Sequence, residues 1–277
     1  MLRRIAVCAI VLLICPLRTH ATVILFIFTP DGIVAGADGR AIHEMGKPSS
    51  DTTIKLVVVQ GHIAVASMNL LSLESSGVTD PIAARRFVIH YDFLSWISHI
   101  EKTLPQRITI ASLADTVAQE SKQAFSHVGV LIALGRLPKK DFLNDTFVTY
   151  LVGGCENGYT SLYEIDYKIN WKEKKLDGPI FQVEVAPGKH FGLYAPAGIT
   201  TTGQVYSGKG DWYREAVSYD SKVGDLAHTP LSMSDAVGVM KALLKVEYHH
   251  VAVIGPPFKI ISLPTSGRVT VRIFHSL

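Results

Sequence analysis

Runs of apolar residues separated by short turns dominate the chain from residue 22 onward. The first of them shows no polar alternation, which is typical of a strand that is buried on both faces. Turn residues such as Pro30-Asp31-Gly32 and Gly61 lie between successive runs. The pattern therefore predicts four strands in two hairpins. They cover residues 22–28, 33–37, 54–59 and 63–66.

The middle of the chain changes to a helical pattern, and strands then return. Residues 81–102 and 109–125 carry apolar positions at spacings that favour two helices, each begun or ended near a proline or threonine. A third amphipathic helix is predicted at 232–248, and 168–175 is interpreted as a charged hairpin tip. Further strands are expected at 147–153, 159–165, 181–185, 191–195, 258–263 and 269–274. Helices laid over a sheet in this order indicate one layered α+β domain.

Residues 1–21 have the three parts of a secretory signal peptide. Arg3 and Arg4 give the positive start, an 11-residue apolar core follows, and Ala21 is the small residue expected before a signal-peptidase cut. The core is short of the roughly 20 residues that a stable anchor needs. We therefore predict export to the periplasm or the medium, with signal peptidase as a processing partner and no stable membrane anchor. The alternatives are an uncleaved anchor and a lipoprotein cut before Cys15.

Removing the leader changes the charge and the cysteine content. Of 27 basic residues, three lie in the leader, so the 24 that remain equal the 24 acidic residues. The mild basicity is therefore no argument for a nucleic-acid partner. Only Cys155 remains of three cysteines, so no internal disulfide is expected. Residues 22–277 are enough for one large core, and we predict a single domain over that range.

Cleavage after Ala21 would make Thr22 the N-terminal residue. An N-terminal threonine carries a nucleophilic hydroxyl and a free α-amine, which can act as the base for its own hydroxyl. An α-amine has an ordinary pKa of about 7.7–8.0, so a useful fraction is neutral near pH 7. With Ala21 still attached, the nitrogen is an amide and cannot accept the proton. The alternative is that Thr22 is only the first residue of an ordinary strand and has no catalytic role.

Four stretches of the sequence resemble the proteasome β-subunit family of N-terminal-nucleophile (Ntn) hydrolases. The stretches are TVILFIFTPDGIVAGADGRA, TTIKLVVVQGHIAVAS, YLVGGCENGYTSLYEID and SMSDAVGVMKALLKV. Asp38 lies 16 residues after Thr22, as in that family, and Lys55 lies 33 residues after it, one further than usual. The resemblance implies the four-layer αββα sandwich of Ntn hydrolases. It also implies amide or peptide hydrolysis through an acyl-enzyme on Thr22, without a cofactor.

The resemblance assigns roles to four further residues. Lys55 would place a fixed positive charge beside Thr22, and Asp38 would pair with that lysine. Asn69 would supply a backbone N–H to the oxyanion hole, at a place where the family has a glycine. Ser207 falls where the family has a serine that assists the terminal amine. The stretch 249–254 lacks the Asp and Ser that the family has after its last helix.

Several alternatives stay open at this stage. Asp38 and Lys55 could be an ordinary turn aspartate and a surface lysine, and Ser207 an ordinary loop serine. His249 and His250 have no further ligand at metal spacing and are interpreted as a helix end, so no metal site is predicted. The chain could be a small-amide acylase instead of a peptidase. It could also be a non-catalytic secreted binding or assembly module. Proteasome β-subunits stack in rings, so a homo-oligomer is a further expectation.

Overall fold

The structure is a computed structural model. It describes residues 23–42, 48–50, 54–79, 86–137, 139, 142–185, 192–194, 204–205, 207–226, 228–251 and 254–277. The predicted leader, residues 1–21, and the predicted nucleophile Thr22 lie outside the described residues.

The first sheet of the described chain has five strands and contains the predicted first hairpin. Its order is β12-β1-β2-β13-β14, and every neighbouring pair is antiparallel. The strands are β1 Ile24–Thr29, β2 Gly32–Ala37, β12 Gly192–Tyr194, β13 Phe258–Pro264 and β14 Thr270–Phe274. The predicted strands at both ends of the chain are thereby confirmed, and β1 and β2 lie in the interior of the sheet.

The second sheet has five strands within the described residues, in the order β11-β10-β9-β6-β5. Its strands are β5 Leu56–Val59, β6 Ile63–Met68, β9 Thr146–Glu156, β10 Tyr159–Asn170 and β11 Lys175–Val185. The second predicted hairpin is therefore β5–β6, and it pairs through β6 with β9. A short ribbon of β3 Ala41–Ile42 and β4 Pro48–Ser50 extends from the end of the first hairpin.

Side chains of β1 alternate between two separate hydrophobic clusters. Leu25 and Ile27 pack in a cluster with helix α6 Met233–His250, whereas Ile24 and Phe26 pack in a cluster with residues of the second sheet. This alternation explains the uninterrupted apolar run, because both faces of the strand are covered. Each such buried side chain contributes roughly 1.5–3 kcal/mol relative to exposure. Because the cluster that contains Ile24 and Phe26 is made of residues from both sheets, the two sheets lie face to face.

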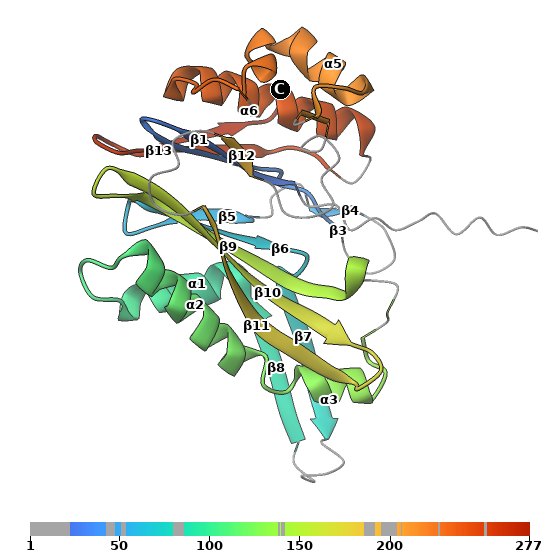
Figure 1. Cartoon of the computed structure of the whole chain (residues 1–277). Helices are drawn as coiled ribbons and strands as arrows, with labels where there is room; N and C mark the ends of the chain where they lie inside the picture. The colour runs from blue at the N-terminus through green and yellow to red at the C-terminus, as the bar shows by residue number, and fades with distance from the viewer. Residues whose placement is uncertain are drawn as a thin grey trace, which may run out of the picture.

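Helices cover the outer faces of the two sheets, as Figure 1 shows. α6 lies on the first sheet, and the shorter α5 Asp211–Tyr219 packs against α6. Ser232 caps the start of α6, and its side chain accepts from the N–H of Asp235. The other helices lie beyond the second sheet. They are α1 Phe93–Thr103, α2 Ile110–Ala124 and α3 Val128–Ala133.

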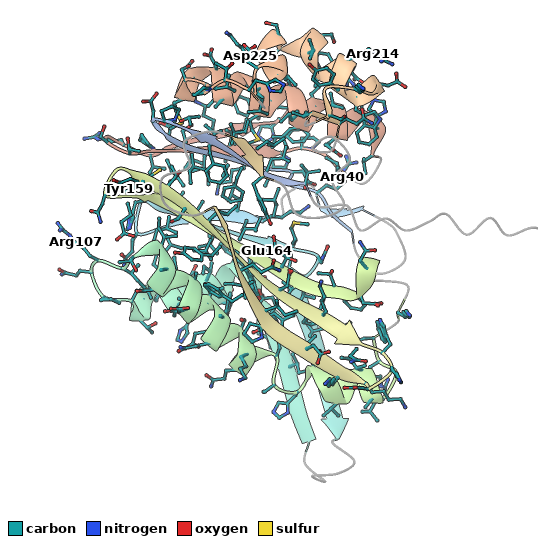
Figure 2. All side chains as sticks on the ribbon, viewed as in Figure 1. Arg40, Arg107, Tyr159, Glu164, Arg214 and Asp225 are labelled. Atoms are coloured by element: carbon teal, nitrogen blue, oxygen red, sulfur yellow. The ribbon has the colours of Figure 1, made fainter. Side chains whose placement is uncertain are left out.

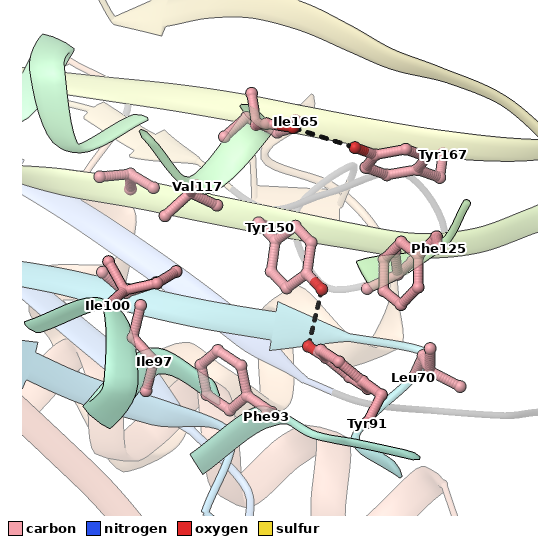
Figure 3. Packing of buried hydrophobic residues seen from close by; sticks show 14 of the residues in the cluster. Leu70, Tyr91, Phe93, Ile97, Ile100, Val117, Phe125, Tyr150, Ile165 and Tyr167 are labelled. Carbon is pink, nitrogen blue, oxygen red and sulfur yellow. Dashed lines mark hydrogen bonds between the residues drawn. The ribbon is translucent and has the colours of Figure 1, made fainter. Parts of the chain in front are cut away.

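An aromatic cluster fills the space between α1–α3 and the second sheet. The hydroxyls of Tyr91 and Tyr150 are 2.6 Å apart, and the Phe125 ring makes edge contacts with Tyr91 and Tyr167 (Figure 3). Burial raises the pKa of Tyr150 well above its ordinary value, so this hydrogen bond joins two neutral phenols. The mixed α and β content predicted for the chain is confirmed by these elements.

The prediction of one helix over residues 81–102 is wrong in its first half. Residues 81–85 lie outside the described residues. Strand β8 Arg86–Asp92 follows them and pairs with β7 Ser72–Thr79, which was not predicted, and helix α1 begins only after Asp92. Ile89 and Tyr91 are buried while Val88 and His90 are exposed, which is the two-residue period of a strand.

Smaller corrections concern the later part of the chain. The predicted hairpin tip at 168–175 is narrower than expected, because β10 and β11 run to Asn170 and from Lys175. Helices α3 and α5 were not predicted. The predicted helices 109–125 and 232–248 are confirmed as α2 and α6.

Candidate active site

A lysine–aspartate pair lies buried at the end of the β1–β2 hairpin. Asp38 directly follows β2, and Lys55 directly precedes β5 in the other sheet. The Lys55 ammonium lies 2.9 Å from one carboxylate oxygen of Asp38 and 3.0 Å from the other. Lys55 is 2% exposed and Asp38 is 1% exposed. The pair predicted from the sequence therefore forms, and it joins the two sheets across their interior.

Asp38 also fixes Val23, the first described residue of the chain, which directly precedes β1. The backbone N–H of Val23 donates to the Asp38 carboxylate at 3.0 Å, and the N–H of Asp38 donates to the Val23 carbonyl at 3.2 Å. The N–H of Arg40 donates to the other carboxylate oxygen at 3.3 Å. Sequence reasoning did not include these backbone donors. The only sign of them in the sequence was the position of Asp38, which follows a predicted strand and precedes a glycine.

Opposing effects act on the protonation of Asp38. Burial raises the pKa of its carboxyl, whereas the Lys55 ammonium and the amides of Val23 and Arg40 act to lower it. Desolvation is the largest of these effects, and it penalises the ionised form. The ionised pair is therefore tolerated here only because each charge has its partner, and neither charge faces water.

A neighbouring loop supports the backbone after Asp38. The N–H of Gly39 donates to the carbonyl of Gly255 at 3.1 Å, and the guanidinium of Arg40 occupies the space that a side chain at Gly255 would need. Figure 2 shows Arg40 at the end of the sheets that lies away from Tyr159. This loop was not predicted to contribute to the site.

Asn69 has the backbone conformation that a glycine would adopt easily. It follows β6 with a φ of 68°, in the left-handed region, where asparagine is tolerated better than most residues. The hydroxyl of Ser67 donates to the Leu70 carbonyl at 2.8 Å, and the Leu70 N–H donates to the Met68 carbonyl, so the turn is tied locally. Its assignment as oxyanion donor stays a prediction.

Ser207 is exposed and engaged within its own turn. Its hydroxyl donates to the Gln204 carbonyl at 3.0 Å and lies 3.4 Å from the Lys209 carbonyl. The Gln204 side chain accepts from the N–H groups of Trp212 and Tyr213 at the start of α5. Among the described residues, no hydrogen bond or ion pair connects Ser207 or Asn69 to the Asp38–Lys55 pair. The role of Ser207 also stays a prediction.

The two histidines at the end of α6 bind a carboxylate of α5. Nδ1 of His249 and Nε2 of His250 lie 2.8 and 2.6 Å from the two oxygens of Glu215. Over the part of the chain that the structure describes, no group of three His, Cys, Asp or Glu residues has the arrangement of a metal site. In the same part, no helix is both long enough and apolar enough to cross a bilayer.

Comparison with known proteins bears on the fold. A scan of protein-family models and a search of curated proteins find no match. Among solved structures, the chain is similar to an Anbu (Gly-1) mutant from Hyphomicrobium sp. strain MC1. The TM-score is 0.50, the identity 13%, and the match covers 92% of this chain and 87% of that one. At this identity the likeness shows that the two chains share a fold, and nothing further.

Proposed function

We propose that the chain is an exported hydrolase of the N-terminal-threonine type, with Thr22 as its nucleophile. The observation that carries the proposal is the buried Asp38–Lys55 pair, because Asp38 also holds the N–H of Val23. Residue 22 is one peptide unit away, and consecutive Cα atoms are about 3.8 Å apart. We also propose that the two sheets and their covering helices form the four-layer αββα sandwich of Ntn hydrolases.

The proposed reaction cleaves an amide bond in two steps. The Thr22 hydroxyl attacks the carbonyl carbon, its proton passes to the Thr22 α-amine, and that amine then protonates the leaving nitrogen. Water attacks the resulting ester in the second step and releases the acid. The charge of Lys55 favours the neutral amine and the attacking oxyanion of Thr22. The backbone N–H of Asn69 is the proposed donor to the tetrahedral oxyanion, and Ser207 is the proposed partner of the terminal amine.

Export and activation are parts of the same proposal. Signal peptidase would remove residues 1–21, and the new α-amine of Thr22 would then be free to act as a base. The leader thus keeps the nucleophile inactive until the chain is exported to the periplasm or the medium. A short peptide or a small amide is the proposed substrate, and assembly into a homo-oligomer is compatible with the fold.

A pair of chains that differ by one residue tests the nucleophile. One chain begins at Thr22 and the other at Ala21, both released from a cleavable fusion. We expect a β-lactone or epoxyketone probe to acylate the first chain on Thr22 and to leave the second unlabelled. Thr22→Ala in the shorter chain is the matched control, and intact mass with peptide mapping is the measurement.

The results separate the proposal from its main rival. Labelling that is equal in all three chains, or that falls outside residue 22, would contradict the nucleophile. Folded chains that stay unlabelled with every probe would favour a non-catalytic secreted module. The absence of the family's Asp and Ser from residues 249–254 also favours that alternative. A mature terminus other than Thr22 in exported protein would contradict the activation step. Circular dichroism confirms folding in each arm.

A further inference from the structure

A cavity of about 310 Å³ lies at the start of α6, on the outer face of the first sheet. Its walls come from α6 and from the last hairpin, β13–β14. The lining residues that matter here are Met233, Ser234, Ser262, Arg268, Thr270 and Arg272. The cavity is separate from the candidate active site, because Ser262 pairs with Val34, four residues before Asp38 on β2. At about 3.4 Å per residue, the separation along the strand is roughly 14 Å.

Polar side chains gather on one face of this hairpin. Thr270 is the register partner of Ser262, and Arg272 follows two residues later on β14. Cross-strand partners and residues two apart on a strand share one face of the sheet, so these three side chains face α6 together. Arg268 joins them from the turn before β14. Within the described residues, Arg268 and Arg272 make no ion pair.

Ser262 gives this cavity a polar group without a partner. Its side chain lines the cavity, the residue is 8% exposed, and its hydroxyl has no hydrogen bond in the part of the chain that the structure describes. A buried hydroxyl without a partner costs about 1–3 kcal/mol, so such groups are normally satisfied. The hydroxyl therefore indicates a binding partner that enters the cavity.

The N-terminus of α6 adds further donors at the same place. The first N–H groups of a helix have no acceptor within it, and the helix dipole favours an anion there. Met233 and Ser234 are the first two residues of α6 and both line the cavity. The acid of this turn, Asp235, is bound by the Ser232 hydroxyl at 2.8 Å and does not line the cavity.

We propose that this cavity binds a small phosphate monoester. The donors at this site are two guanidinium groups, the hydroxyls of Ser262 and Thr270 and the amides at the start of α6. They are more hydrogen-bond donors than the two oxygens of a carboxylate can accept, but they suit the three terminal oxygens of a phosphate. Met233 and Val237 form an apolar wall beside these donors. The volume leaves room for a small organic group on the phosphate, and the wall gives that group a surface to contact.

Binding of three probes to the full chain tests the ligand class. The probes are inorganic phosphate, phenyl phosphate and benzoate, measured by titration calorimetry at constant ionic strength. We expect phenyl phosphate to bind more tightly than inorganic phosphate, and benzoate to bind at least tenfold more weakly than phenyl phosphate. Equal affinity for benzoate and phenyl phosphate would overturn the phosphate assignment, and no binding of either phosphate at millimolar concentration would overturn the site.

Substitutions test whether the cavity is the place of binding. Arg272→Ala and Arg268→Ala should each weaken phenyl phosphate binding about tenfold or more, because each removes a charge-assisted contact. Ser262→Ala should weaken binding without any change of net charge. Arg107→Ala is the matched control, since it removes an exposed arginine from the loop between α1 and α2, on the side of the molecule away from α6 (Figure 2). An equal loss in the control, or unchanged binding in folded Arg272→Ala and Ser262→Ala variants, would contradict the proposal.

Discussion

At the scale of single residues, the buried Asp38–Lys55 pair predicts how substitutions change the free energy of unfolding. Removing one charge leaves the other buried without compensation, which typically costs about 3–5 kcal/mol, whereas removing both costs much less. Lys55→Met should therefore lower the free energy of unfolding at pH 7 more than the double variant Asp38→Asn/Lys55→Met does. Urea unfolding of both variants and the parent chain measures the difference. Additive effects of the two substitutions would contradict a coupled pair.

The cost of Lys55→Met should also depend on pH. Without the lysine, only the amides of Val23 and Arg40 oppose the effect of burial, which raises the pKa of Asp38 above the ordinary value of 3.8. A raised pKa means that the folded chain holds the proton more tightly, so the penalty grows as pH rises above about 4 and is small below it. We expect the deficit in unfolding free energy to be smaller at pH 4 than at pH 7, and an equal deficit would contradict this account.

Cys155 gives a second prediction at this scale. Burial raises the pKa of its thiol to about 12, and the thiol donates to the Leu263 carbonyl at 3.2 Å. Because the thiolate is the reactive form, the folded chain from residue 22 should be alkylated by iodoacetamide at pH 8 far more slowly than the same chain in urea. Mass spectrometry over time measures both rates. Similar rates would show that the thiol is accessible and ionised in the folded chain.

The sequence predicted the central pair of the candidate site but not its backbone contacts. Asp38 and Lys55 stood out because the aspartate after one strand matched a known spacing and the lysine before another missed it by one residue. The amides of Val23 and Arg40 have no sequence signal of their own, since every residue but proline has one. The left-handed turn at Asn69 was equally hidden, because asparagine favours that conformation only weakly.

At the scale of elements, one carboxylate connects two helices of the outer layer. Glu215 of α5 contacts His249 and His250 at the end of α6 and accepts from Tyr219. Desolvation acts to raise the pKa of Glu215, but the hydrogen bonds from His250, His249 and Tyr219 lower it to about 2. The Glu215 side chain is 25% exposed and both histidines more so, so we expect only about 0.5–1 kcal/mol from the cluster.

The pH dependence of this contact follows from the lowered pKa. A carboxyl with a depressed pKa stabilises the fold above its unfolded value of about 4.5, and that stability is lost as pH falls toward 2. Glu215→Gln should therefore lower the melting temperature at pH 6 by a few degrees, and the difference should shrink between pH 4.5 and 2. Glu120→Gln, at an exposed position of α2, is the control and should change little at either pH.

Elements were predictable where one signal dominated. Both faces of β1 and β2 are covered, and the sequence shows this as long apolar runs. In residues 81–102 two signals overlapped, because the alternation through Ile89 and Tyr91 runs directly into the helix that begins after Asp92. The Asp92 side chain caps α1 by accepting from the N–H of Ser95 at 2.8 Å, and this cap was the boundary that a purely helical interpretation missed.

At the scale of the whole molecule, the layered arrangement predicts which strands unfold only when the whole domain unfolds. β1 and β2 are interior strands of the first sheet, with every residue buried, and they touch both α6 and the second sheet. β14 is an edge strand whose residues are mostly exposed. Backbone amides that are covered on both sides exchange only through global unfolding, whereas edge amides exchange through local opening.

Hydrogen exchange followed by mass spectrometry tests this order directly. We expect peptides from β1 and β2 to exchange slowest, with a free energy of opening equal to that of global unfolding in urea, and peptides from β14 to exchange much faster. Strand β5 is the informative comparison, because it is also an edge strand but follows Lys55. If the buried pair ties the two sheets together, Lys55→Met should accelerate exchange in β5 more than in β14. Equal acceleration in both strands would mean that the pair stabilises the molecule without linking its two sheets.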